Sequence, residues 1–439
     1  EERQTDGVKL LYHDVETNGI GYVTALFDLS EIEEELLPYA GILQSVLGII
    51  DTEHYGYGEL FNEINVHTGG IGTSLELYTD VTKVKEKEFR ATFEIKGKAL
   101  YPKLDVLFAM MREILMESKL GDEKRLKEIL SMLKTRLQTS FLSAGHTTAV
   151  LRSLSYTSPI ARFRDITSGI GFYEVVKDLE ENFEERKELL IENLKKIAGR
   201  IFRKENLMLS YTSAQEGLAV LEKAVPQFAD SLHTGEKESH GQCIIHCKKR
   251  NEGFRTSSKV QYVARTGNFI DGGAEYTGAL QILKVILSYD YLWQNVRVKG
   301  GAYGCMSGFN RIGEGYLVSY RDPNLEKTME IYEGVVDYLK NFDIDDRDMN
   351  KFIIGTISNL DRPMNPAAKG SRSLNLYMNR ITEEMIRRER EQILDAQQED
   401  IRGLATVLEA VLAAGELCVI GSEEKIEEAK EMFGEIRTL

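Results

Sequence analysis

Cysteine and proline are both scarce in this sequence. Its 439 residues include four cysteines (Cys243, Cys247, Cys305 and Cys418), which are too few for the disulfide framework of a secreted protein. The low cysteine count favours a reducing interior, and we predict a cytoplasmic location. Only seven prolines interrupt the expected helices and strands. Hydrophobic residues make up 42% of the chain, which is ordinary for a globular protein, and the length allows two or three domains.

Long apolar runs and an excess of positive charge are also missing. No run approaches the ~20 apolar residues that a membrane-spanning helix needs, so we expect no membrane partner. The first ten residues, "EERQTDGVKL", lack the apolar core of a signal peptide and an initiator Met, so the chain is expected to begin inside a longer polypeptide. A net charge of −15 disfavours binding to a phosphate backbone, and "CKKR" at 247–250 is too small a basic patch. We expect no nucleic-acid partner.

The sequence contains no complete motif for phosphate or metal binding. It has neither a phosphate-binding G-x-x-x-x-G-K-[ST] loop nor a strand that leads into G-x-G-x-x-G. The stretch "IDTEH" places Glu53 and His54 at the last two positions of the zinc-protease motif H-x-x-E-H. Ile50 stands where the first His is required, and an aliphatic side chain cannot bind zinc. We therefore predict no metal site in this chain.

Two weaker clusters have structural explanations. "HGQCIIHC" brings together two His and two Cys, at His240, Cys243, His246 and Cys247. Such spacing is compatible with zinc, but the alternation is typical of a strand, whose neighbouring side chains face opposite ways. The pair Ser143 and His146 in "SFLSAGHTTA" has no supporting catalytic motif and is interpreted as a turn at a helix end.

The main positive feature is a weak internal repeat. Three pairs of segments occur in the same order in the two halves: 39–48 with 276–288, Gly69-Gly70 with Gly300-Gly301, and 207–213 with 417–422. Each copy reads as an alternating strand, an apolar helix, a Gly-Gly strand paired with another strand, several amphipathic helices, and a last strand and helix. One of these helices is expected at 123–142.

The repeat predicts an α+β fold of two homologous domains. Each domain is expected to be a mainly antiparallel sheet with helices packed on one side. The first domain is predicted at 1–225 and the second at 255–439, with a polar, charged linker at 226–254.

The second Gly-Gly pair lies in "NVRVKGGAYGCMSG", residues 295–308. On one extended strand, Arg297 and Tyr303 would point to the same face, because six residues separate them. Gly300 and Gly301 would let a ligand backbone come close, so they are predicted to bind substrate. The simpler alternative is a solvent-facing Arg and a Tyr packed on the sheet.

The segments "TNGIGY", "TGGIGTSLEL" and especially "RVKGGAYG" resemble the inverzincin metallopeptidases of the pitrilysin/insulinase family. The resemblance covers essentially the whole chain and fits the C-terminal half of the presequence-protease subfamily. It implies two halves that close around an unfolded peptide, with zinc and the general base in the N-terminal half. It also implies that Arg297 and Tyr303 are the Arg and Tyr with which the C-terminal half reaches the substrate near the scissile bond.

The resemblance has one clear departure, because neither repeat carries the zinc motif. The sequence therefore predicts one half of a zinc-dependent endopeptidase that degrades short unfolded peptides, forms one wall of its chamber and is inactive alone. Its partners would be the N-terminal half, in the same polypeptide or as a separate subunit, and the peptide. Two alternatives stay open: a metal-free scaffold or non-catalytic subunit with the same fold, and a stand-alone peptide-binding module.

Overall fold

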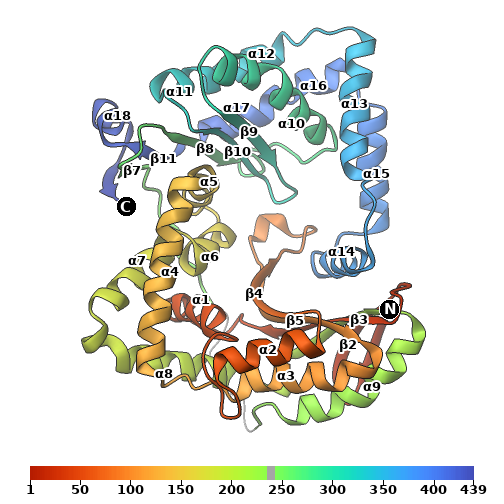
Figure 1. The fold of residues 1–439 in the computed structure, drawn as a ribbon. Coiled ribbons are helices and arrows are strands. Elements are labelled where there is room, and N and C mark those ends of the chain that lie inside the picture. Colours follow the sequence, from red (N-terminus) through yellow and green to blue (C-terminus); the bar gives the residue numbers. More distant parts are fainter. Residues whose placement is uncertain (235–242) are drawn as a thin grey trace.

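The described residues form two six-stranded sheets, one in each half of the sequence (Figure 1). The computed structural model describes residues 1–234 and 243–439. The strands of the first sheet are β1 (Glu2–Thr5), β2 (Val8–Asp14), β3 (Ile20–Asp28), β4 (Ile71–Tyr78), β5 (Arg90–Leu100) and β6 (Leu207–Ser213). Those of the second are β7 (Glu252–Thr256), β8 (Tyr262–Asn268), β9 (Gly304–Phe309), β10 (Glu314–Tyr320), β11 (Glu416–Ser422) and β12 (Glu435–Thr438).

The two sheets share one topology. Their strand orders are β1-β2-β6-β3-β5-β4 and β12-β7-β11-β8-β10-β9. In each sheet the third strand along this order pairs in parallel with the second and antiparallel with the fourth. The last strand of each order, β4 or β9, lies at an edge. The sheets differ at the other edge, where β1 is antiparallel to its neighbour and β12 is parallel.

Helices occupy matching positions in the two repeats. The first repeat contains α1 (Leu37–Val46), α2 (Tyr57–His67), α3 (Leu104–Met116), α4 (Glu123–Ser143), α5 (Gly145–Leu154), α6 (Pro159–Ser168), α7 (Ile170–Glu181), α8 (Phe183–Ile201) and α9 (Gln215–Asp230). The second contains α10 (Ala279–Tyr289), α11 (Glu326–Glu333), α12 (Val335–Lys340), α13 (Asp346–Leu360), α14 (Pro366–Met378), α15 (Glu383–Leu394), α16 (Gln398–Gly403), α17 (Ala405–Ala413) and α18 (Glu423–Glu428).

The internal repeat and the α+β prediction are confirmed. The matched apolar segments lie on α1 and α10, and each Gly-Gly pair comes shortly before an edge strand, β4 or β9. The helix expected at 123–142 is α4, where the Asp122 side chain accepts a hydrogen bond from the Arg125 amide and caps the first turn. The domain limits stay a prediction: α9 ends at Asp230 and β7 begins at Glu252, both within the predicted linker.

The structure adds a feature that the sequence pattern did not predict, because each sheet is covered on its second face by a helix of the other repeat. On the second sheet, Val263 and Leu317 pack into the core formed with its own helices. Tyr262 and Val318, from the same strands, pack instead into the core of the first repeat. Alternate side chains of a strand face opposite sides, so both faces of this sheet are buried.

Helix α5 of the first repeat covers the second sheet (Figure 1). Its first residue, Gly145, lies so close to Tyr262 that an added Cβ would come within 2.3 Å of the ring. Near its other end, the buried hydroxyls of Ser153 and Thr266 are 2.7 Å apart. Close approach and a shared hydrogen bond therefore fix α5 on β8.

Helix α14 of the second repeat covers the first sheet in return (Figure 1). Leu374 packs against Leu11, Leu26, Tyr78 and Met208, which lie on the face turned away from the sheet's own helices. Helix α14 follows the long helix α13 as α5 follows α4, so the exchanged helices hold equivalent places in the two repeats.

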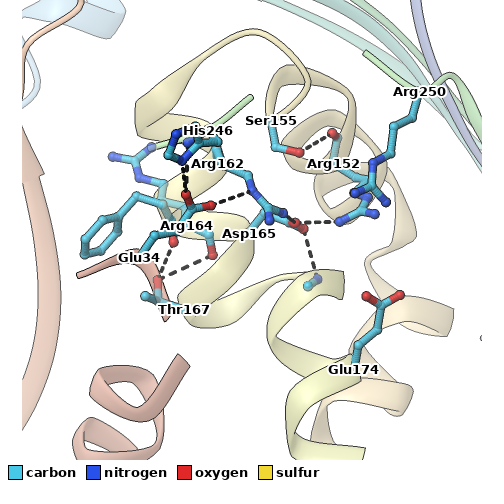
Figure 2. Close-up of polar contacts among 12 residues, drawn as sticks. Glu34, Arg152, Ser155, Arg162, Arg164, Asp165, Thr167, Glu174, His246 and Arg250 are labelled. Atoms are coloured by element: carbon cyan, nitrogen blue, oxygen red, sulfur yellow. Dashed lines mark hydrogen bonds and ion pairs between the residues drawn. The ribbon is translucent and has the colours of Figure 1, made fainter. Parts of the chain in front are cut away.

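A buried ion cluster joins the repeats beneath α5. Arg152 of α5 donates to Asp165 Oδ2 of α6 at 2.6 Å and to both carboxylate oxygens of Glu252, on β7, at 2.5 and 2.8 Å. Figure 2 shows Arg152 and Arg162 converging on Asp165. Arg152 is 2% exposed and both carboxylates are fully buried. Burial alone raises the pKa of Glu252, but the hydrogen bonds and charge of Arg152 outweigh it and hold that pKa below its usual range.

Arg152→Met should destabilise the protein by about 3–5 kcal/mol, because it removes the nearest cation of two buried carboxylates and leaves only longer contacts, such as Arg162 at 3.2 Å from Asp165 and Arg437 at 3.6 Å from Glu252. Urea denaturation measures the change in the free energy of unfolding. The control is Arg186→Met, which removes a half-exposed ion pair with Asp178 at 3.2 Å and should change stability by at most about 1 kcal/mol. Equal effects of the two substitutions would contradict a special role for the buried cluster.

The same cluster predicts acid sensitivity. A carboxylate whose folded-state pKa is lowered stabilises the fold above its unfolded pKa, about 4.3 for Glu, and loses this contribution as the pH falls through the folded pKa. Glu252→Gln should therefore flatten the fall in stability below about pH 4.5, measured as the melting temperature across pH 3–7. An unchanged pH profile in this variant would show that Glu252 does not carry the acid sensitivity.

Candidate functional site

Arg297 and Tyr303 lie on opposite sides of a tight Gly-Gly turn at the edge of the second sheet. The chain passes from α10 into a π-helical turn, η5 (Trp293–Val298), then through Gly300 and Gly301 into β9. The prediction that both residues share one extended strand is therefore wrong. Val296 of this turn is completely buried, and burying it together with Leu292, one helical turn earlier, favours a coiled backbone here.

Arg297 is held by an aromatic ring. Its guanidinium carbon lies 3.8 Å from the ring centroid of Trp293, four residues earlier in the same turn. This stacking orients the planar donor group while leaving its N–H groups at the ring edge. Sequence reasoning missed Trp293, although it is the only tryptophan of the chain and stands four residues before the Arg.

Tyr303 is one of the most exposed large side chains of the described residues, at 70%. Its amide donates to the carbonyl of Tyr320 at 3.0 Å, which continues the β9–β10 pairing by one residue. No hydrogen bond joins its hydroxyl to any residue in 1–234 or 243–439. The backbone is thus fixed while the hydroxyl is free to meet a ligand. The alternative of a Tyr packed on the sheet does not describe this side chain.

The two glycines have local structural reasons. A Cβ on Gly300 would lie 2.4 Å from the carbonyl oxygen of Val296, and Gly301 has a φ of +85°, which favours glycine. In the first repeat Gly70 has a φ of +107° at the equivalent place. Gly-Gly is therefore a turn common to both repeats, and the predicted substrate-binding role of Gly300 and Gly301 stays a prediction.

The His and Cys residues considered for metal binding do not gather at one place. Among the described residues, no group of three or more His, Cys, Asp or Glu side chains could hold a metal ion. His240 lies outside the described residues. The segment 243–250 is irregular, so the strand expected there is not formed. His246 Nδ1 is 2.9 Å from Glu34, and burial raises the pKa of the Cys243 thiol to about 11, which disfavours a thiolate ligand.

The two remaining candidates have structural roles. His54 Nδ1 pairs with the buried Glu113 of α3 at 2.9 Å and so ties the loop between α1 and α2 to α3. Ser143 and His146 flank the junction of α4 and α5, as predicted for a helix-end turn. The His146 ring contacts Tyr320 edge-on, with centroids 4.9 Å apart, and Ser143 Oγ donates to its own helix at the Thr139 carbonyl.

Comparisons with known proteins place the chain in a family. Residues 1–179 match the model for the region associated with peptidases of family M16, subfamily C, and residues 251–423 match "PreP C-terminal domain". The chain belongs to the presequence-protease branch of the M16 peptidases. It corresponds to the C-terminal half of such a peptidase. Within 1–234 and 243–439, none of the helices combines the length and the hydropathy that a membrane span requires.

Individual relatives agree with this assignment. Protein HypA of Clostridium perfringens is 37% identical over 441 residues, covering 100% of this chain and 45% of the relative. Presequence protease 1, chloroplastic/mitochondrial, of Arabidopsis thaliana is 30% identical over 426 residues, covering 97% and 39%. The fold matches a peptidase M16 inactive domain from Pseudomonas fluorescens with a TM-score of 0.62 at 12% identity, covering 96% and 97%. The chain thus spans less than half the length of these two curated relatives.

Gly300→Ala should destabilise this M16 chain by about 1–3 kcal/mol, since the added Cβ would clash with the Val296 carbonyl. The matched control is Gly199→Ala in α8, where a Cβ meets open space and the change should be neutral or stabilising by up to about 1 kcal/mol. Thermal unfolding measures both. A Gly300→Ala variant of unchanged stability would favour the purely substrate-facing role of the glycine.

Proposed function

We propose that this chain supplies the substrate- and oxyanion-binding pair Arg297 and Tyr303 to a zinc-dependent endopeptidase that degrades short unfolded peptides. It would form one wall of the closed chamber, while the metal and general base belong to the N-terminal half. The observation that carries the proposal is the exposed Tyr303 hydroxyl, which is free of hydrogen-bond partners among the described residues and stands on a hydrogen-bonded backbone, across the Gly-Gly turn from the stacked Arg297.

Tyr303 has the chemistry needed to stabilise a developing oxyanion. When a peptide carbonyl is attacked, negative charge accumulates on its oxygen, and a fixed donor at that position lowers the barrier. The phenol donates one O–H. The backbone hydrogen bond from Tyr303 to Tyr320 fixes the main-chain position from which this side chain extends. An exposed hydroxyl without a hydrogen-bond partner in 1–234 or 243–439 can point toward the other half of the enzyme.

Arg297 is suited to holding the peptide backbone. A guanidinium offers several donors in one plane, so it can bind one or two carbonyl oxygens of a substrate at once. Stacking on Trp293 reduces the rotamer freedom that would be lost on binding. Its role in the proposal is to position the substrate, while Tyr303 stabilises charge that appears only in the transition state.

The preference for unfolded peptides follows from the position of the pair. Tyr303 directly precedes β9, whose outer edge is not paired with another strand of the described residues. An extended peptide can add to such an edge through main-chain hydrogen bonds, whereas a folded protein cannot present a free strand. This supports a substrate class defined by backbone conformation.

The proposal assigns no activity to the chain by itself. The described residues provide no metal-binding group, so metal-assisted attack would depend on the N-terminal half. The alternative is a metal-free scaffold of the same fold, for which an exposed Tyr and a stacked Arg on either side of one turn have no use. The cytoplasmic location stays a prediction; the relative from Arabidopsis thaliana carries "chloroplastic/mitochondrial" in its name.

The test is cleavage of an unstructured fluorogenic peptide by this chain combined with its N-terminal half. Activity should appear only in the combination and should be lost on removing zinc with a chelator. Tyr303→Phe should lower kcat by about 10²–10³, the usual effect of losing one oxyanion donor, with little change in the melting temperature.

Tyr289→Phe is the matched control, because Tyr289 is 72% exposed and lies in the same repeat. It should leave kcat unchanged. If Tyr303→Phe cleaves as fast as the unmodified protein, the role given to Tyr303 is wrong. If the combined halves show no peptidase activity at all, the scaffold alternative is favoured instead.

A further inference from the structure

We propose that Asn324 is a positioning residue, which clamps the Gly-Gly turn of the second repeat and so sets the relative placement of Arg297 and Tyr303. The inference rests on the proposed function, since it concerns how that pair is held. Within the described part of the chain, no hydrogen bond joins the Asn324 amide to either side chain of the pair. Asn324 therefore acts through the turn between them.

The clamp is a short hydrogen bond to the turn. Asn324 Nδ2 donates to the carbonyl oxygen of Gly300 at 2.6 Å. The same nitrogen is 3.4 Å from Asp322 Oδ1. Both neighbours can only accept, so the amide nitrogen and not the amide oxygen must face them. A carboxylate of the same shape at position 324 could not make this bond.

Asp322 holds Asn324 in place. Its fully buried carboxylate accepts from the backbone N–H of Asn324 at 2.9 Å and from the Thr328 hydroxyl at 2.6 Å. Its backbone exchanges hydrogen bonds of 2.7 and 2.8 Å with Gln261, at the start of β8. Burial raises the pKa of Asp322 above its usual range. A buried carboxyl is costly unless well bonded, so this one marks a turn whose geometry is closely specified.

The Gly300 carbonyl that Asn324 bonds lies in the turn between Arg297 and Tyr303. Before it, the Gly301 amide donates to the Arg297 carbonyl at 2.9 Å, which ties the turn to the Arg. After it, the Tyr303 amide donates to Tyr320 at 3.0 Å, which ties the turn to β10. Asn324 joins the two sides, because it follows β10 by four residues and bonds the glycine that follows η5.

The first repeat provides an internal comparison. It has the same Gly-Gly turn, but the segment after β5 reads "YPKL" where the segment after β10 reads "RDPNL". There the Gly69 amide bonds the Lys98 carbonyl at 2.7 Å, and no Asn among the described residues reaches the turn. The Asp322–Asn324 clamp is therefore particular to the repeat that carries Arg297 and Tyr303.

The single tryptophan gives a readout that needs no activity. Trp293 is stacked under Arg297, so acrylamide quenching of its fluorescence in the 439-residue chain reports how well Arg297 covers the ring. Asn324→Ala and Asn324→Asp should raise the quenching constant, and Arg297→Ala, which removes the covering side chain, sets the upper limit. Asn324→Ala should not lower the melting temperature by more than the control variant described next, whereas Asn324→Asp should lower it further, because it places a second carboxylate beside the buried Asp322.

The control is Asn341→Asp, which removes a similar 2.8 Å bond from a side-chain amide to a backbone carbonyl, that of Asp337, in the same repeat. It should not change the quenching. In the protein combined with its N-terminal half, Asn324→Ala should lower kcat by about 10- to 100-fold with KM nearly unchanged, because misplacement by about 1 Å is costly. A purely structural role would lower the melting temperature first.

The outcomes separate this inference from the proposed function. If Tyr303→Phe loses activity while Asn324→Ala alters neither quenching nor kcat, the clamp is overturned and the proposed function stands. Altered quenching without any loss in kcat also overturns the positioning role. Loss of kcat in both variants, at constant melting temperature and with raised quenching in Asn324→Ala, supports it. If Tyr303→Phe has no effect, both fail together.

Discussion

The guanidinium of Arg152 lies between two buried carboxylates, and this contact ties the repeats into one body. Asp165 belongs to the first repeat and Glu252 to the second, so one cation serves both. Such a cluster adds little net stability over apolar packing, but it is costly to break, and its hydrogen bonds specify one geometry. It therefore fixes how α5 lies on the second sheet.

The second sheet connects the Arg152 cluster to Arg297 and Tyr303. Glu252 opens β7, which pairs with β11, and the pairing continues through β8 and β10 to β9 at the edge. The Tyr303 amide donates to the carbonyl of Tyr320 on β10. Asn324 lies in the turn that follows β10 and bonds the Gly300 carbonyl from there. The exchange of α5 and α14 places a helix of the other repeat on the second face of each sheet, so Tyr262 and Val318 of the second sheet and Leu11 and Leu26 of the first are buried there.

The two repeats share the backbone of the Gly-Gly turn but not the side chains proposed to act there. The turn glycines with positive φ, Gly70 and Gly301, recur because the same backbone enters the same edge strand. Arg297, Trp293, Tyr303 and the Asn324 clamp occur in the second repeat alone, where the first has no counterpart at the edge. One duplicated fold thus carries its proposed chemistry at only one of two equivalent edges.

Local patterns along the chain were enough to locate the repeat and several of its elements, whereas the roles proposed for Arg297 and Tyr303 came from the family resemblance. Hydrophobic periodicity and turn glycines are local signals, so α4, β3 and the two Gly-Gly turns could be located without coordinates. The local signal failed at Arg297, because Val296, Arg297 and Val298 alternate as in a strand, although burial of Val296 selects a helical turn. The helix exchange, the Arg152 cluster and the Asn324 clamp became visible only in three dimensions. Each joins residues far apart in the sequence, and no local pattern records which distant surfaces will meet.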